Sequence, residues 1–250
     1  SNQFWLAVQA GDEAGRASEM DGAGDAGATP LARSIVSNAT YIGMGAGVSN
    51  PSGDANDPFI IHRDDNATSY YNSIFTGGRT DKGIQIEDLD GTVDAADRWD
   101  DPSTSAVGDG PLDHQNNSWF NIGPNYDASA GFGPLVQVTR DEDGNATGDR
   151  GEDMIANLAD YLAKNGNELL SSSPLASIDR SGNNGEVNTF NPTTSSAVAS
   201  STTQPSDFGQ RSAGVNDRFV APNGRGAFAS GAQWGDLSWT KLASDGELTQ

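Results

Sequence analysis

The stretch that decides the fold is Asp57-Pro-Phe-Ile-Ile-His-Arg-Asp-Asp65, followed by Ala67-Thr-Ser-Tyr-Tyr-Asn-Ser-Ile-Phe-Thr-Gly-Gly78 and Lys82-Gly-Ile-Gln-Ile-Glu-Asp88. These three β-branched and aromatic runs are short and separated by polar turns, which predicts strands and not a buried helix. Apolar and polar residues alternate in 84–87, which predicts one buried and one exposed strand face. Phe59 and Gly83 open two similar strands 24 residues apart, a distance that suggests one winding of a solenoid.

A weak internal repeat extends this pattern. An Asn, a small residue, large apolar residues and a Gly recur in Asn38-Ala-Thr-Tyr-Ile-Gly43, Asn72-Ser-Ile-Phe-Thr-Gly77 and Asn117-Ser-Trp-Phe-Asn-Ile-Gly123. A strand-like run precedes each of them, at 4–8, 59–62 and 84–87, so we expect three successive coils with two strands each. Residues 35–42 form one strand in this interpretation. Long insertions at 10–30, 48–56 and 89–111 would leave from corners on one side, as is usual in solenoids.

The repeated asparagines predict a side-chain ladder. Asn38, Asn72 and Asn117 would stack along the axis and hydrogen-bond to one another, as Asn side chains do in cross-β stacks. The alternative is that they are three unrelated turn residues, because Asn is common in turns.

The rest of the chain predicts one more strand and one helix. The strand lies at 134–139, and the helix at 152–164 has an apolar stripe, an acidic start and a Gly after its end. We expect solenoid coils in 1–140, an acidic loop with a capping helix in 141–166, and an irregular segment with a docking aromatic tail in 167–250. These parts would form one structural unit.

Composition fits a narrow solenoid better than a wide globular core. Only 34% of the 250 residues are hydrophobic, and each coil of a solenoid needs few inward side chains. Aromatic residues in strand-like runs argue against uniform disorder. The net charge of −21 repels nucleic acid and anionic membranes, and suits cations, high salt or simple solubility.

The chain contains no cysteine, which excludes disulfides, Cys-zinc sites and thiol catalysis. We find no signal peptide, lipidation motif or membrane span in it. The first residues read as the interior of a strand. We therefore expect a mature product or fragment that forms the C-terminal part of a longer protein.

Several runs together resemble a known family of secreted surface proteins of Bacteroidota. They are Gln3-Phe-Trp-Leu-Ala-Val-Gln9, Glu19-Met-Asp-Gly22, Asn38-Ala-Thr-Tyr-Ile-Gly43, Tyr70-Tyr-Asn-Ser-Ile-Phe75 with Gln85-Ile-Glu-Asp-Leu89, and the tail from Gly226-Ala-Phe228 through Trp234 to Trp239-Thr-Lys-Leu242. The resemblance covers most of the chain and implies an all-β, right-handed parallel β-helix exported by type IX secretion. Long loop insertions, a capping helix near 152–164 and an irregular C-terminal tail would decorate it. It carries over no catalytic residue, because the family has no agreed one.

The best metal candidate is an acidic loop before the helix. Its spacing is that of an EF-hand, with side chains at loop positions 1, 3, 5, 9 and 12 and a carbonyl at 7. The predicted calcium ligands are Asp141, Asp143, Asn145, the Thr147 carbonyl, Asp149 and Glu152. Ala146 stands where a Gly should make the sharp turn, and the alternative is an acidic turn that caps the helix. A second, weaker calcium candidate is Asp88-Leu-Asp-Gly-Thr-Val-Asp94, which lacks a twelfth-position acid.

A carbohydrate site is a further possibility at the end of 57–65. The glycan contacts would be Arg63, Asp64 and Asp88, since β-helix glycosidases and lyases combine acids with a basic side chain. Adjacent strand residues point to opposite faces, so Asp64 and Asp65 should not converge, and a solvated strand end is the competing interpretation. His114 is expected at a corner, and two histidines 52 residues apart do not predict a zinc site.

Three functional hypotheses follow. The first is a non-catalytic β-helix protein, extracellular or on the outer-membrane surface, with a structural, adhesive or ligand-presenting role. Its partner would be a surface glycan or another cell-surface protein, and calcium the only cofactor. The second is a carbohydrate-active β-helix, either a lyase, a hydrolase or a glycan-binding module. The third is a self-assembling fibre subunit, because an open solenoid end exposes strand edges.

Overall fold

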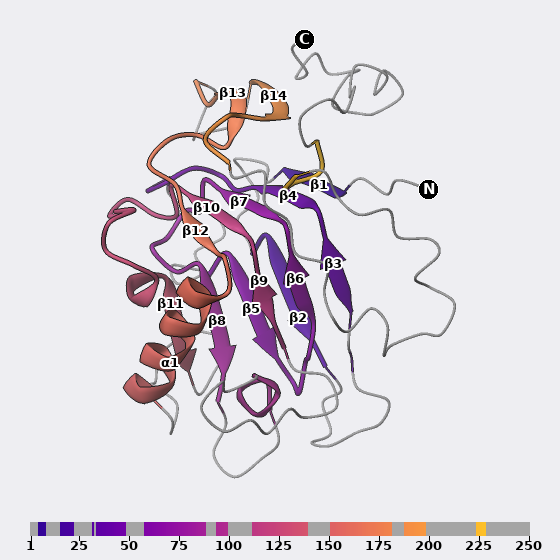
Figure 1. Ribbon diagram of the computed structural model, residues 1–250, viewed down its shortest axis with the longest axis vertical. Helices are drawn as coiled ribbons and strands as arrows, with labels where there is room; N and C mark the ends of the chain where they lie inside the picture. Colours follow the sequence, from indigo (N-terminus) through magenta and orange to yellow (C-terminus); the bar gives the residue numbers. More distant parts are fainter. Residues whose placement is uncertain are drawn as a thin grey trace.

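The computed structural model describes residues 5–8, 16–22, 32, 34–48, 58–88, 94–99, 112–139, 151–181, 188–198 and 224–228. These residues form mostly β-structure in parallel sheets, together with one α-helix, α1 (Gly151–Lys164) (Figure 1). The described part of the chain contains no helix long and apolar enough to cross a membrane.

Three parallel sheets make up the body. Sheet A contains β1 (Trp5–Val8), β4 (Ala39–Ile42), β7 (Ile74–Thr76), β10 (Ser118–Phe120) and β12 (Glu168–Leu169). Sheet B contains β2 (Ser18–Asp21), β5 (Ile60–Arg63), β8 (Ile84–Glu87) and β11 (Val136–Thr139). Sheet C contains β3 (Ile35–Ser37), β6 (Ser69–Tyr71) and β9 (His114–Gln115). Outside them lie the antiparallel hairpin of β13 (Leu175–Asp179) and β14 (Thr189–Thr194), and the 3-10 turns η1 (Ala96–Arg98) and η2 (Gly133–Leu135).

The chain visits sheets A, B and C in turn, and each of the first three windings uses three strands. Strand β4 pairs with β7, β5 with β8, and β6 with β9, all in parallel. The prediction of two strands per coil was wrong, because 35–42 and 67–78 each contain two strands that belong to different sheets. Asn38 and Asn72 separate them with φ angles of 57° and 51°. This left-handed conformation turns the backbone sharply, and Asn tolerates it better than most residues.

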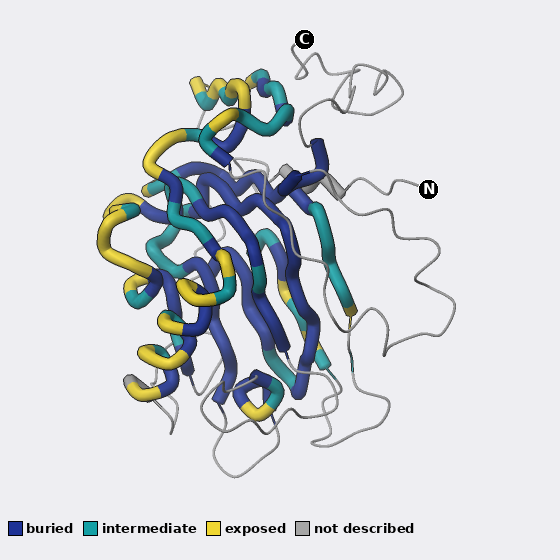
Figure 2. The backbone as a smooth tube through the Cα atoms, in the orientation of Figure 1, coloured by how far each residue is buried: buried dark blue, intermediate teal, exposed yellow. Residues whose placement is uncertain are grey.

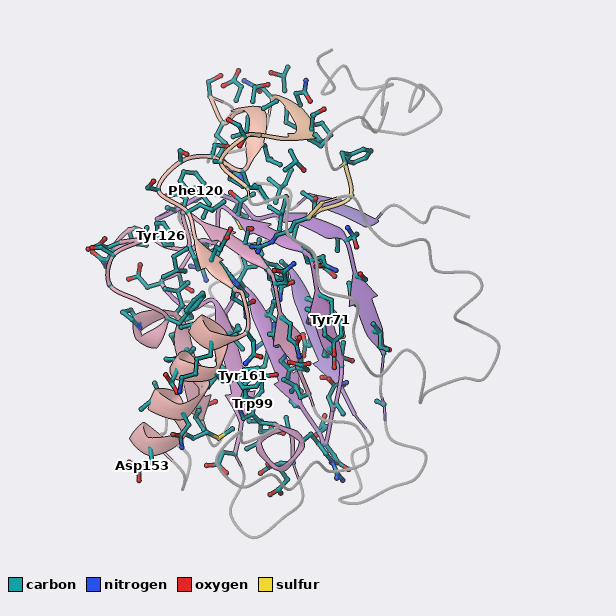
Figure 3. The ribbon with its side chains drawn as sticks, in the orientation of Figure 1. Tyr71, Trp99, Phe120, Tyr126, Asp153 and Tyr161 are labelled. Carbon is teal, nitrogen blue, oxygen red and sulfur yellow. The ribbon has the colours of Figure 1, made fainter. Side chains whose placement is uncertain are left out.

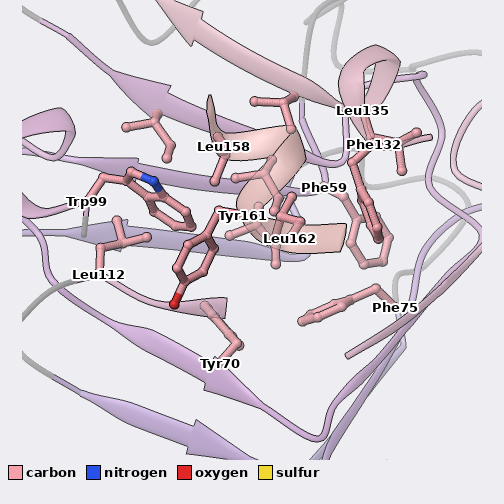
Figure 4. Packing of buried hydrophobic residues seen from close by; sticks show 14 of the residues in the cluster. Phe59, Tyr70, Phe75, Trp99, Leu112, Phe132, Leu135, Leu158, Tyr161 and Leu162 are labelled. Atoms are coloured by element: carbon pink, nitrogen blue, oxygen red, sulfur yellow. The ribbon is translucent and has the colours of Figure 1, made fainter. Parts of the chain in front are cut away.

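The core lies between the three sheets and contains columns of stacked side chains. Tyr41, Phe75 and Trp119 come from successive strands of sheet A, and their rings stack at 5.3 Å and 4.2 Å. Figure 4 shows Phe75 near Tyr70 and Phe59 in this interior. Stacked aromatic rings contribute beyond the apolar area that they bury. The aromatic runs of the sequence therefore supply much of the core.

Strand β8 departs from the predicted exposure. Ile84 and Ile86 belong to the core, whereas Gln85 and Glu87 face the other side of sheet B. Both polar residues are nevertheless buried, at 0% and 5% exposure, and Figure 2 shows β8 buried along its length. The prediction of an exposed face was wrong. Alternation identifies the side chains that face the core, but it does not reveal whether the opposite face is covered.

Helix α1 takes the place of a sheet C strand in the last winding. It follows β11, precedes β12 of sheet A, and packs against β11 and η2. Leu158 and Leu162 are fully buried in the core cluster, with Tyr161 beside them (Figure 4). Met154 belongs to the same cluster. The backbone N–H of Asn116 donates to the Asn165 carbonyl at 2.9 Å, just after the helix. The predicted helix at 152–164 is confirmed, and it covers the core beside the final strands.

The sequence predicts an irregular segment with a docking tail in 167–250, but the described residues of this region contain β12, β13 and β14. The hairpin β13–β14 lies near the outer face of sheet A (Figure 1), where the Arg180 guanidinium donates to the Gly43 carbonyl. Residues 224–228 lie on the same face, with Phe228 only 2% exposed. The remainder of the predicted docking tail, 229–242, lies outside the described residues.

Candidate functional site

The corner between sheets C and A is the most regular polar feature of the described chain. Strand register aligns Thr40 with Ile74, and Ile74 with Ser118. Asn38, Asn72 and Asn116 therefore occupy the same corner position, and all three have positive φ, at 57°, 51° and 58°. The Asn116 Nδ2 group donates to Asn72 Oδ1 at 2.7 Å. This is a ladder contact between adjacent windings.

The predicted ladder is one residue out of register at its third member. Asn117 lies beside this column and belongs to a second one. Its Oδ1 accepts from the Ser73 N–H at 2.8 Å, and its Nδ2 donates to Asn167 Oδ1 at 3.1 Å. Residues 116 and 117 are both Asn, so the sequence repeat alone did not reveal which one aligns with Asn72.

Two buried histidines meet inside the core, a contact that the sequence did not predict. His62 comes from β5 and His114 from β9, and both are 0% exposed. Their Nε2 atoms lie 3.0 Å apart. His114 was expected at a corner, but it is an inward residue of sheet C that stacks on Tyr70 at 5.1 Å. The three-strand winding brings the two histidines together.

The hydrogen bonds assign a tautomer to each ring. His62 Nδ1 lies 3.2 Å from Asn66 Oδ1, an oxygen that also accepts from the Thr68 N–H. His62 Nδ1 therefore carries a proton, and its Nε2 accepts from His114 Nε2–H, since a neutral imidazole has one donor and one acceptor. The remaining nitrogen, His114 Nδ1, is buried with no hydrogen-bond partner among the described residues.

Burial keeps both rings neutral. It lowers the pKa of His62 to about 4, and the hydrogen bond to Asn66 opposes this shift only in part. Burial also holds the pKa of His114 well below its ordinary value, and the adjacent His62 adds to the effect. The two rings bind protons less readily in the folded protein than in the unfolded chain. The pair therefore makes the stability of the fold depend on pH.

The buried carboxylate of Asp113, which precedes His114 in sequence, joins three elements. Asp113 Oδ1 accepts from the Tyr161 hydroxyl at 2.5 Å, and Oδ2 accepts from the Tyr71 hydroxyl at 2.8 Å. The Gln115 amide donates to the same Oδ2 at 2.7 Å. Trp99 packs edge-on against Tyr161 at 4.9 Å, and Figure 3 labels Tyr71, Trp99 and Tyr161 in this region. The cluster connects α1 to β6 and to the residues around β9.

The His62–Asp65 run is not a solvated strand end. His62 is in the core, and Asp65 is 2% exposed and pairs with Arg98 through two contacts, one of them at 3.1 Å. Asp64 and Asp65 both have positive φ, at 51° and 61°, and form the turn after β5. The interpretation of these acids as wet turn residues was therefore wrong for Asp65.

Of the three predicted glycan contacts, Asp88 is buried and the other two are partly exposed. Arg63 lies within 3.3 Å to 3.5 Å of carboxylate oxygens of Glu19, Asp21 and Asp64, in a partly exposed cluster at the end of β5. Asp88 lies one strand further on and is only 2% exposed. Arg63 and Asp64 thus lie together near solvent, whereas Asp88 does not share their exposed surface.

The predicted calcium loop lies outside the described residues, except for its last position. Nothing is described for Asp141, Asp143, Asn145, Thr147 or Asp149, and Glu152 is in the first turn of α1. In the second candidate, Asp94 Oδ1 accepts from the N–H groups of Ala96 and Asp97, which starts η1. Among the described side chains, no three His, Asp or Glu gather as a metal site. Calcium binding stays a prediction.

Comparison with known proteins identifies no relative. No family model matches the chain, and no curated protein or solved structure matches it. The resemblance to secreted Bacteroidota surface proteins therefore stays a prediction.

Proposed function

We propose that the chain is a right-handed parallel β-helix that serves as a non-catalytic extracellular scaffold and presents long loops to a partner at the cell surface. The observation that carries this proposal is the cyclic order of sheets A, B and C with parallel pairing throughout. Such a stack gives a rigid support whose connections can vary in length without altering the core.

The connections differ in a way that supports loop presentation. From sheet C to sheet A the chain always turns within one or two residues, at 38, 72–73 and 116–117. The long connections, 43–59 and 88–113, instead join sheet A to B and sheet B to C. Both sides of sheet B therefore carry insertions, while the Asn corner carries none.

Charge and composition favour an exposed location. A net charge of −21 suits a secreted or outer-membrane-surface protein that avoids nucleic acid and anionic lipid, and the absence of cysteine does not exclude that location. The partner would be a surface glycan or another surface protein. The acidic loop 141–152 would bind calcium there, with oxygen ligands of the type that this ion prefers.

Loop replacement tests the scaffold proposal. Residues 100–110 would be exchanged for a short Gly-Ser linker, with a matched variant that exchanges 50–56. We expect either variant to keep the unfolding temperature of the parent, while binding in a glycan array or to intact cells is lost in at least one. A large fall in unfolding temperature for both variants would contradict the proposal, since the insertions would then be part of the core.

A carbohydrate-active β-helix is the second candidate. The Arg63 cluster favours it, because a partly exposed guanidinium lies among three carboxylates at the end of β5. Turnover assays on acidic polysaccharides, with and without calcium, would test it, using Arg63→Ala as the matched control. If the parent turns over a polysaccharide and Arg63→Ala does not, the carbohydrate-active function replaces the scaffold proposal. The fibre hypothesis has less support, because α1 packs over the core at the last winding.

A further inference from the structure

One arginine is buried on the outer face of sheet A without belonging to any sheet. Arg225 is 1% exposed and lies in 224–228, which we call the strap. Burying a guanidinium is costly unless oxygen acceptors surround it. The environment of Arg225 therefore has to be a formed site.

Five oxygen atoms surround the guanidinium. Nη2 donates to Asn116 Oδ1 at 2.7 Å and to the Gly166 carbonyl at 3.1 Å. Nη1 donates to Ser118 Oγ at 2.9 Å and to the Asn117 carbonyl at 3.3 Å. Glu168 Oε2 lies 3.0 Å from Nη1 and supplies the opposite charge. Acceptors on both arms of the planar fork distinguish arginine from lysine.

This site is the C-terminal end of the Asn ladder. Register with Ser118 and Glu168 puts Gly166 at the corner position that Asn116 and Asn72 occupy in earlier windings. Gly166 has φ of 72°, and a Cβ there would lie 2.9 Å from Asn116 Oδ1. Because the next corner residue is a glycine, space remains beside Asn116 Oδ1 at the end of the ladder, and the Arg225 guanidinium fills that space.

The backbone of the strap also forms hydrogen bonds with the earlier windings. The Gly226 N–H donates to the Asn72 carbonyl at 2.7 Å, and Asn38 Nδ2 donates to the Gly224 carbonyl at 2.7 Å. Gly226 has φ of 81°, and a Cβ there would lie 2.5 Å from Ile74 Cδ1. The site therefore requires glycine after arginine as well as the guanidinium itself.

We propose that this corner is a docking site for a Gly-Arg-Gly segment, filled within one molecule by its own strap and, once that strap is displaced, by the strap of a second copy. All the contacts above come from three consecutive residues, so the strap binds as a short peptide would. Each molecule carries both the site and the segment, so exchange between two copies needs no other partner.

A peptide titration tests the site. The probe is Gly-Arg-Gly-Ala-Phe with both ends blocked, added to the full-length protein and to its Arg225→Ala variant while its fluorescence anisotropy is followed. We expect saturable binding to the variant at least tenfold tighter than to the parent, whose own strap competes. A control peptide with Ala in place of the second Gly should not bind. Equal binding to both proteins, or none to the variant, overturns the proposal.

Arg225→Lys serves in the same titration if Arg225→Ala fails to fold. Lysine keeps the charge but loses the fork, so its strap should compete less well than the parent's, and the probe should bind to it more tightly than to the parent. Indistinguishable binding to Arg225→Lys and the parent would count against a guanidinium site.

Mixing two variants tests exchange between copies. Glu168→Lys opposes its own strap with a like charge and leaves Arg225 available, whereas Arg225→Ala offers a vacant site without a ligand. Light scattering should show that an equimolar mixture forms a larger species than either variant alone. A mixture that keeps the mass of its components rules out docking of a second copy's strap.

Discussion

Acidification from about pH 7 to about pH 5 should destabilise the protein through its buried histidine pair. His62 and His114 are both neutral in the core, where burial opposes protonation of either ring, and their Nε2 atoms lie 3.0 Å apart. The unfolded chain binds these protons near pH 6.5, the ordinary histidine value. Because the folded pKa is lowered, stability is fully present above about 6.5 and is lost as the pH falls toward about 4.

The magnitude follows from His62. A folded pKa of about 4 against an unfolded value of about 6.5 gives a loss of about 2 kcal/mol between pH 7 and pH 5. The pKa of His114 is lowered in the same direction, so it adds to this loss. The uncharged neighbours Tyr70, Trp99 and Asn66 offer no negative charge that would offset the protonation. A change of this size is a substantial fraction of the roughly 5–15 kcal/mol that keeps a domain folded.

Urea unfolding followed by tryptophan fluorescence measures the effect at each pH. The matched control is His62→Met, which introduces the residue that β2 already carries in register, Met20, and removes the titrating group. The parent should lose about 2 kcal/mol more than this variant over the same pH range. Equal losses would refute the reasoning, because carboxylates common to both proteins would then explain them.

Three further outcomes are expected. Asn116→Ala should lower the free energy of unfolding in urea by about 2–4 kcal/mol, because alanine loses the ladder bonds and adopts positive φ poorly. Asn116→Gly should recover the part of this loss that comes from the backbone conformation. Leu158→Ala should cost about 2–5 kcal/mol because this helix residue is fully buried, against less than about 0.5 kcal/mol for the exposed Asn157→Ala. Millimolar calcium should raise the unfolding temperature of the parent but not of Asp141→Asn, and an equal rise in both would remove the calcium loop.

The sequence predicted α1 and most strands of the three sheets because local chemistry determines their type, whereas β2, β13 and β14 lie in stretches that it predicted as an insertion or as irregular chain. Short β-branched and aromatic runs became parallel strands, and the stripe around Leu158 and Leu162 became the buried face of α1. The number of strands per winding could not be predicted from local chemistry. A single Asn with positive φ, at 38 or 72, divides one apolar run between two sheets, and its side chain gives no sign of this in the sequence.

The candidate site was harder to predict because it depends on register. Asn116 and Asn117 are chemically identical, so only the pairing of Ser118 with Ile74 decides which one joins the ladder. His62 and His114 meet because sheets B and C face the same core, a contact across 52 residues that no local pattern encodes. Arg225 lies 109 residues beyond Asn116 in the chain and could not be matched to it from spacing.

The long separation in sequence between Arg225 and its acceptors affects the order of folding. Neighbouring strands such as β4 and β7 pair across 34 residues, whereas the strap must close loops of up to 187 residues to reach Thr40. Loop closure costs more entropy as the loop lengthens, and the acceptors for Arg225 exist only after two windings have stacked. Strap docking is thus a late kinetic step, and it should slow unfolding more than it speeds folding.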